Sequence, residues 1–96
     1  MASNFKILVH RNSHNLHLKL MGDFDGSSAW ELLHVLKKSA TGVYKVIIHT
    51  GSLKQIYPFG RDTFLENLRH WNVEPIRILF TGEKAGQIAP EESACL

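Results

Sequence analysis

The sequence predicts an α/β domain built on a mixed β-sheet of four to five strands, with helices mainly on one face of the sheet. Near the N-terminus, apolar residues occupy every second position in two neighbouring stretches, which is typical of a hairpin with one buried face. Further along, apolar residues recur at helical spacing in two segments separated by a short apolar run. This succession indicates the order β-β-α-β-α-β-α.

The predicted hairpin covers residues 5–21. Apolar residues alternate along both of its strands. Pairing Arg11 with Leu16 places Val9 opposite Leu18, with both side chains on the apolar side. A shift of one residue would turn one apolar set toward water, so the pattern determines the register.

The first helix is expected to begin near Ser28. Ser28 and Glu31 have the spacing of a capping box, in which two side chains satisfy free amides at a helix start. Gly42 supplies a stop. One face of this helix is apolar and packs on the sheet; its residues are Ala29, Leu32, Leu33, Leu36 and Ala40.

A nearly continuous apolar run over residues 44–49 indicates a central strand that is covered on both faces or parallel to a neighbour. A second amphipathic helix is expected from Gly60 or Arg61 to Trp71, with Asn72 after its end. Its apolar stripe consists of Phe64, Leu65, Leu68 and Trp71.

The C-terminal part completes the pattern. Pro75 marks the entry to a further strand over residues 76–80. A short helix is expected over about 83–88, and Pro90 ends it. The tail over residues 91–96 is expected to be mobile.

Size and composition limit the possible function classes. The 96 residues, 44% of them hydrophobic, suffice for one compact core and not for two, which indicates a single domain over 1–96 with its core at about 5–89. The formal net charge of +2 comes from 11 basic and 9 acidic residues spread along the chain, so nucleic-acid binding is not expected.

The longest apolar runs fall far short of the roughly 20 residues that span a bilayer, and the N-terminus lacks the apolar region of a signal peptide. Membrane insertion is therefore not expected, and the protein is expected to be cytoplasmic. The single cysteine, Cys95, excludes an intrachain disulfide and a cysteine-based metal motif.

The end of the hairpin carries a family motif. Leu20–Asp25, followed by Ser27, Ser28 and Ala29, resembles the pattern of a hydrophobic residue, glycine, an acidic residue, a hydrophobic residue and aspartate that precedes the first helix of the STAS family. This family includes the anti-sigma factor antagonists. The resemblance implies a mixed sheet with flanking helices, no cofactor, and a bacterial signalling role in which the domain docks to a kinase-like anti-sigma factor during partner switching.

A second family motif runs from the third strand to the second helix. Residues 46–48 match its strand, His49 replaces the terminal aspartate, Tyr57 replaces the second aspartate, and Gly60 matches the helix-opening glycine. Pro58 falls at the phosphate acceptor. Phosphorylation acts by adding about two negative charges, and proline has no hydroxyl to carry them. The resemblance therefore implies a site that is not switched at this position. Thr50, Ser52, Tyr57 and Thr63 are nearby hydroxyls that could accept phosphate in its place.

The predicted partner-binding surface brings two segments together. Pro58 fixes its own φ and suits the first turn of a helix, so this turn should be stiff. Tyr57 and Phe59 then either project as apolar anchors for a partner or fold into the core. The candidate residues are Asp23, Asp25, Tyr57, Pro58, Phe59, Gly60, Arg61 and Asp62.

Neither catalysis nor metal binding is expected. Asp23 and Asp25 need not converge, no nucleophile–base pair is visible, and Asp25 is better explained as a cap of the first helix. His10 and His17 lie opposite each other in the predicted hairpin, but a structural zinc site normally needs four ligands. His49, at the end of a buried strand, is expected to be a hydrogen-bonded and partly buried side chain.

These observations favour a non-enzymatic regulatory module that binds a protein partner, such as a kinase-like anti-sigma factor or a sensor protein. The sequence leaves a homodimer open. The alternative is a domain that senses a small ligand, a nucleotide or an anion, in a crevice at the strand ends. Four glycines would line that crevice: Gly26, Gly51, Gly60 and Gly82.

Overall fold

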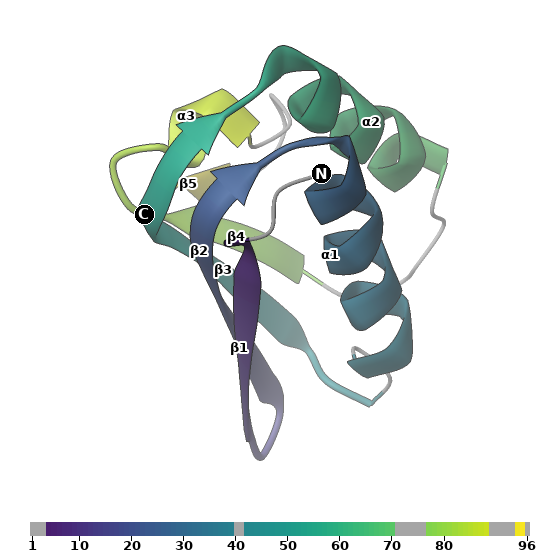
Figure 1. Cartoon of the computed structure of the whole chain (residues 1–96). Helices are drawn as coiled ribbons and strands as arrows, with labels where there is room; N and C mark the ends of the chain where they lie inside the picture. The colour runs from purple at the N-terminus through teal and green to yellow at the C-terminus, as the bar shows by residue number, and fades with distance from the viewer. Residues whose placement is uncertain (1–3, 40–41, 71–76, 89–93, 96) are drawn as a thin grey trace.

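The computed structural model describes residues 4–39, 42–70, 77–88 and 94–95 (Figure 1). The elements follow the predicted order and add a fifth strand. In chain order they are β1 (Lys6–Asn12), β2 (Asn15–Phe24), α1 (Gly26–Ser39), β3 (Lys45–Ile56), α2 (Pro58–His70), β4 (Arg77–Thr81), α3 (Ala85–Ile88) and β5 (Ala94–Cys95).

The strands form one mixed sheet in the order β1-β2-β3-β4-β5. β1 runs antiparallel to β2, and the other neighbouring pairs are parallel. Helices α1 and α2 pack against each other on the same side of the sheet (Figure 1). The predicted fold class is therefore confirmed, because each parallel pair from β2 to β4 is joined by a helix that returns over one face.

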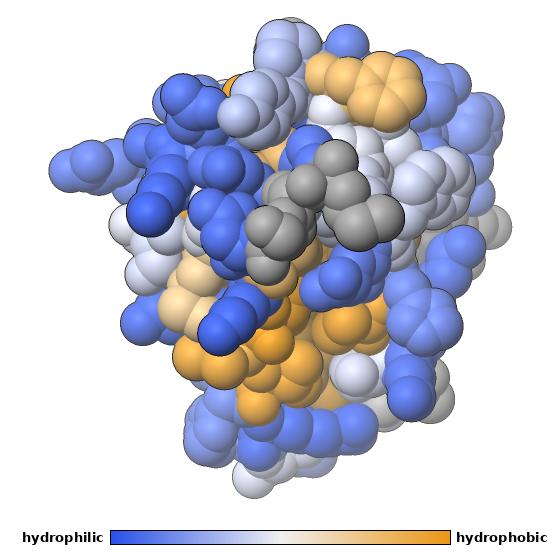
Figure 2. Space-filling model, viewed as in Figure 1, coloured by the Kyte–Doolittle hydropathy of each residue, from blue (hydrophilic) through white to orange (hydrophobic). Residues whose placement is uncertain are grey.

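The hairpin has the predicted register. Arg11 pairs with Leu16 and Val9 with Leu18. Leu18 is fully buried, whereas Val9 remains 51% exposed because β1 is the edge strand of the sheet. Figure 2 shows the resulting apolar surface over β1 and beside α1.

The core lies between the sheet and the helices. Three phenylalanine rings from β2, α2 and β4 meet edge to face: the centroids of Phe24 and Phe64 are 6.1 Å apart, and those of Phe64 and Phe80 are 6.3 Å apart. All three side chains are fully buried. Such pairs add about 0.5–1.5 kcal/mol each beyond the burial of their area, so this row ties α2 to the sheet.

Several predicted boundaries differ from the structure. α1 begins at Gly26, before Ser28, and α2 begins at Pro58, before Gly60. β3 extends to Ile56, well beyond residue 49, and α3 begins at Ala85. Helices α1 and α2 each begin earlier in the chain than predicted, because residues before each predicted start supply the caps, as described below.

The prediction that β3 is parallel to a neighbour is confirmed, since it is parallel to both β2 and β4. The alternative that it is covered on both faces is wrong. Val46 and Ile48 are fully buried on the helix side, while Ile47 and His49 point the other way and are half-buried.

Within the tail that was expected to be mobile, Ala94 and Cys95 pair with Leu79 and Phe80 of β4. This pairing satisfies backbone groups that β4 would otherwise present at a sheet edge. Several predicted features lie outside the described residues: Ala40, Trp71, Asn72, Pro75, Ile76, Pro90, residues 91–93 and Leu96. In the described part of the chain, no helix has the length and apolar character needed to cross a membrane.

Candidate functional site

The starts of α1 and α2 lie side by side and form the candidate site. β2 and β3 end as a parallel pair, Phe24 opposite Ile56, and each strand leads directly into a helix. The Tyr57 amide continues this pairing by donating to the Phe24 carbonyl at 2.9 Å. We call residues 25–28 and 57–62 the corner.

Asp25 caps α1. Its Oδ1 accepts hydrogen bonds from the Ser28 amide and the Ser27 hydroxyl, both at 2.9 Å, and its carbonyl accepts from the Ala29 amide at 2.9 Å. The hydrogen bond from the Ser28 backbone is the main cause that lowers the pKa of Asp25 to about 2. The expected capping role of Asp25 is thus confirmed.

The predicted capping box at Ser28 is wrong. Ser28 is buried in the first turn of α1, with its hydroxyl 2.9 Å from the Asp23 carbonyl oxygen and 3.0 Å from Asp25 Oδ1. Both aspartate and serine are good caps, so the local sequence admits either start. The structure selects Asp25 because β2 extends to Phe24 and leaves Asp25 at the point where the chain turns.

Two glycines allow the two helix starts to approach each other. A Cβ atom on Gly60 would lie 2.6 Å from the carbonyl carbon and oxygen of Asp25. A Cβ atom on Gly26 would lie 2.7 Å from Cε2 of the Phe59 ring. A larger residue at position 60 would therefore force the corner open, whereas one at position 26 would displace the exposed Phe59 ring. The two halves of the corner are held in backbone contact at Gly60.

The structure decides between the two placements of the aromatic residues. Pro58 is the first residue of α2, and the Tyr57 carbonyl accepts from the Arg61 amide at 3.0 Å, as at a helix N-cap. Phe59 is 74% exposed and Tyr57 is 44% exposed. Neither side chain is folded into the core.

Asp23 and Asp25 do not form a pair of carboxylates. Asp23 Oδ2 accepts from Asn4 Nδ2 at 3.3 Å, and the Asp23 amide lies 3.3 Å from Asn4 Oδ1. The carbonyl of Asp23 thus accepts a hydrogen bond from Ser28 in the corner, while its carboxylate contacts Asn4. Sequence reasoning missed Asn4, because a single polar residue ahead of a strand carries no pattern.

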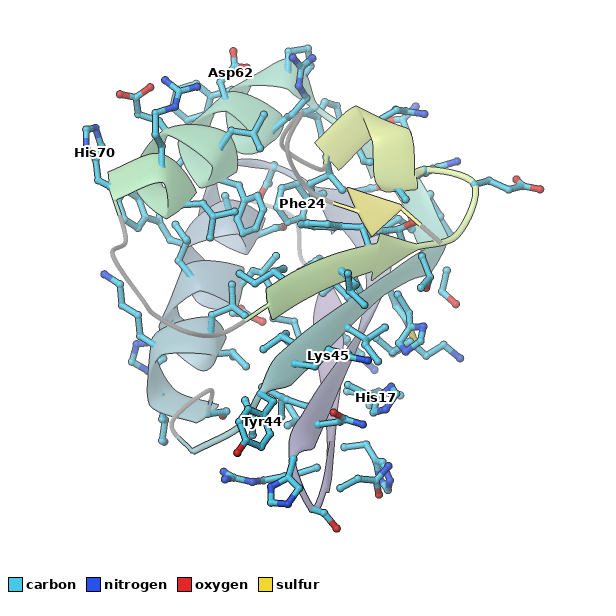
Figure 3. The ribbon with its side chains drawn as sticks, turned by 180° about the vertical axis from the view of Figure 1, so that it is seen from behind. His17, Phe24, Tyr44, Lys45, Asp62 and His70 are labelled. Carbon is cyan, nitrogen blue, oxygen red and sulfur yellow. The ribbon has the colours of Figure 1, made fainter. Side chains whose placement is uncertain are left out.

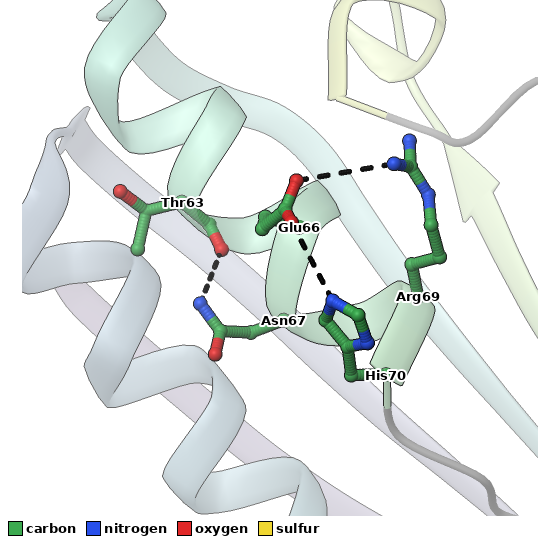
Figure 4. A network of polar contacts seen from close by, with 5 residues as sticks. All are labelled: Thr63, Glu66, Asn67, Arg69 and His70. Atoms are coloured by element: carbon green, nitrogen blue, oxygen red, sulfur yellow. Dashed lines mark hydrogen bonds and ion pairs between the residues drawn. The ribbon is translucent and has the colours of Figure 1, made fainter.

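Arg61 and Asp62 are exposed in the first turns of α2, with Asp62 on its outer surface (Figure 3). Further along, Glu66 contacts Arg69 at 3.8 Å and His70 at 3.4 Å, and Asn67 donates to the Thr63 carbonyl at 2.8 Å (Figure 4). Such exposed pairs add little stability. The outer face of α2 is therefore polar and mixed in charge beside the aromatic corner.

The four glycines of the ligand-sensing alternative do not meet in one crevice. Gly26 and Gly60 belong to the corner, whereas Gly51 and Gly82 approach each other elsewhere, since a Cβ atom on Gly82 would lie 2.7 Å from the Gly51 amide nitrogen. Gly51 precedes the end of β3 at Ile56, and strand geometry separates these positions by roughly 15 Å.

Three histidines form a diagonal line across the sheet, away from the corner. His10 lies opposite His17, as predicted, with ring centroids 6.2 Å apart. His17 Nδ1 lies 3.1 Å from His49 Nε2, the two rings are stacked 5.3 Å apart, and His49 Nδ1 lies 2.8 Å from Thr81 Oγ1. His49 is thus hydrogen-bonded and half-buried, as expected. Among the described residues, no group of three or more histidine, cysteine, aspartate or glutamate side chains is arranged to hold a metal ion.

Comparison with known proteins identifies the architecture. No family model matches the sequence, and no curated protein matches it either. Among solved structures, the anti-sigma factor antagonist SpoIIAA in its unphosphorylated form aligns over 96% of this chain and 86% of its own, with a TM-score of 0.63 and 12% identity. The fold is therefore STAS-like.

Two further structures share this STAS-like fold. An uncharacterized protein from Shewanella loihica with a SpoIIAA-like fold aligns over 100% of this chain and 90% of its own, with a TM-score of 0.63 and 17% identity. Mglu aligns over 90% of this chain with a TM-score of 0.67 and 23% identity. This chain spans only 20% of the length of Mglu. At these identities the likeness concerns the fold, and it confirms the architecture implied by the two STAS motifs.

Proposed function

We propose that this chain is a non-enzymatic regulatory module that binds a protein partner through the corner, in the manner of an anti-sigma factor antagonist. The observation that carries the proposal is the 74% exposure of the Phe59 ring on a turn whose backbone is held from both sides. The STAS-like fold shared with SpoIIAA supports a role in protein–protein interaction.

The corner is organised in advance of binding. Pro58 restricts the backbone at the start of α2, and Gly60 rests on the backbone of Asp25. An aromatic side chain on a rigid support loses little conformational entropy when a partner covers it, and such residues dominate interface energies. Phe59 and Tyr57 therefore act as the apolar anchors of the interface.

Charged residues surround these anchors. Arg61 and Asp62 are exposed in the turn that follows Phe59, and Asp23 lies at the end of β2 beside the start of α1. Charges at the rim of an interface mainly select the partner and set the rate of association. We assign them the choice of partner, such as a kinase-like anti-sigma factor or a sensor protein in the cytoplasm.

Binding through this surface is constitutive in our proposal. In the STAS alignment Pro58 occupies the acceptor position, and the two residues after it, Phe59 and Gly60, also lack a hydroxyl. A phosphoryl group would repel a closely packed partner by adding about two negative charges. Without an acceptor at residues 58–60, that means of release is absent at this position.

No catalytic role is proposed for the corner. The carboxylate of Asp25 is occupied with capping α1, and that of Asp23 contacts Asn4. The low pKa of Asp25 keeps it ionised at neutral pH, which is unsuited to general acid chemistry.

The test compares Phe59→Ala with Tyr44→Ala. Tyr44 is a matched control because it is 65% exposed and lies at the opposite end of β3 from the corner. Partners are captured from the native host with the wild-type protein and identified, and their affinities are then measured by calorimetry. We expect Phe59→Ala to weaken binding on the order of 30-fold, as for a typical hot spot, and Tyr44→Ala to have little effect.

Both variants should keep the melting temperature of the wild type, because each removes an exposed side chain. Unaltered affinity of the Phe59→Ala protein for every captured partner would rule out the corner as the docking surface.

A further inference from the structure

The side of the sheet opposite α1 and α2 carries a second surface. We call it the open face. Strand alternation places on it Lys6, Leu8, His10, His17, Lys19, Met21, Asp23, Lys45, Ile47, His49, Leu79 and Thr81. Each of these side chains is exposed or half-buried, whereas residues of the two central strands on the helix side, such as Leu18 of β2 and Ile48 of β3, are fully buried.

Residues of the open face form continuous rows across four strands. One row joins Leu8, Lys19, His49 and Thr81, and the next joins His10, His17, Ile47 and Leu79. Figure 3 shows His17 and Lys45 on the side of the sheet that faces away from α1. The surface is thus a single patch that contains both basic and apolar side chains.

Basic side chains outnumber acidic ones on the open face. It contains three lysines and three histidines against one carboxylate, Asp23, which lies at the end of β2 and contacts Asn4. The other described carboxylates lie elsewhere: Asp25, Glu31, Asp62 and Glu66 belong to α1, α2 or their starts, and Glu83 lies in the turn after β4. An approaching anion therefore meets no carboxylate within these rows.

We propose that the open face binds an acidic, partly apolar segment of a protein partner, independently of the corner. The lysines match carboxylates of such a segment, and its apolar side chains contact the aliphatic groups between them. Leu8 is 53% exposed, and Ile47 and Leu79 are half-buried in the middle of the patch, so each gains burial when it is covered.

Nucleic acid fits this surface less well. Single strands bind to sheets through exposed aromatic rings on which bases stack. The rings of His17 and His49 are stacked on each other, 5.3 Å apart and 7° from parallel. The aliphatic side chains of Leu8, Ile47 and Leu79 lie around these rings and suit a polypeptide.

The probe is a synthetic peptide in which glutamate and leucine alternate, and its control has glutamine in place of glutamate. Binding is measured by fluorescence anisotropy at low salt. We expect Lys6→Glu combined with Lys19→Glu to weaken binding about tenfold or more, because like charges then face each other. Lys45→Glu provides an independent second variant on β3.

The matched control is Lys37→Glu combined with Lys38→Glu, which makes the same change in net charge on exposed residues of α1. This control should bind the acidic peptide within about twofold of the wild type, since it is remote from the patch. Phe59→Ala should also bind normally, so failure of the corner and failure of the open face give different results.

Several outcomes would overturn the proposal. They are equal losses in both double variants, equal binding of the glutamine peptide, or tighter binding to a single-stranded oligonucleotide or to phosphatidylserine vesicles. Self-association that the Lys6 and Lys19 changes abolish, without peptide binding, would reassign the open face to a second copy of this chain.

Discussion

The contact between Gly60 and Asp25 can be tested by adding one methyl group. In Gly60→Ala the new Cβ atom would lie 2.6 Å from the Asp25 carbonyl, while ordinary contacts begin at 3.4 Å. Both partners are backbone atoms at the starts of packed helices, so neither can rotate away. The two halves of the corner must separate by about 0.8 Å.

The magnitude follows from two opposing effects. Overpacking of a rigid site costs about 1–3 kcal/mol, and the upper half of this range applies because backbone must move. Alanine in place of glycine within a helix contributes about 1 kcal/mol in the other direction. The net loss is about 1–2 kcal/mol, which for a domain of this size lowers the melting temperature by roughly 5–15 °C.

The assay is thermal unfolding followed by circular dichroism, with Gly86→Ala as the control. Gly86 lies in α3, and no atom lies within 4 Å of the position that its Cβ atom would occupy. This control should equal or exceed the stability of the wild type. A Gly60→Ala protein as stable as the Gly86→Ala protein would refute the argument that the corner is held by backbone contact.

Two further predictions concern ionisable groups. Asp25→Ala should lower the free energy of unfolding at pH 7 by about 1 kcal/mol, since it removes the cap of α1. Because the folded-state pKa of Asp25 is lowered to about 2, this difference from the wild type should shrink as the pH falls from 4 toward 2. A difference in the free energy of unfolding that stays constant over this range in urea titrations would contradict the capping role. Burial is the main cause that lowers the pKa of His49. Neutral His49 should therefore contribute to the free energy of unfolding above its unfolded-state pKa, and this contribution should be lost as the pH falls below about 6.5. Unfolding of His49→Gln should therefore depend less on pH in this range. An NMR titration that places the pKa of His49 above its ordinary value of about 6.5 would contradict the assignment.

Much of the architecture could be read from periodicity. The hairpin register was predictable because a one-residue shift would expose Leu16, Leu18 and Leu20, which are fully buried. The helices were predictable from their apolar stripes. The start of α1 was less predictable, because Asp25, Ser27 and Ser28 are all acceptable caps and only the length of β2 decides among them.

The sequence predicted which residues form the corner, but not how their side chains are placed. The STAS motifs placed Asp25 near Pro58, and the structure has both at adjacent helix starts. Exposure of Phe59 could not be inferred, since an aromatic residue in the first turn of a helix also serves as a core staple. The exposure depends on how α1 and α2 pack, which places the Phe59 ring beside Gly26 and leaves it 74% exposed.

The sequence by itself determined the order of the elements, the pairing of the hairpin, and a turn at Pro58, Phe59 and Gly60 that lacks a hydroxyl. Only the tertiary structure decided where the charges lie. A net charge of +2 is a sum along the chain and has no direction. Strand pairing sorts alternate side chains to opposite faces, and in this sheet it collects Lys6, Lys19 and Lys45 on the side that the helices leave uncovered.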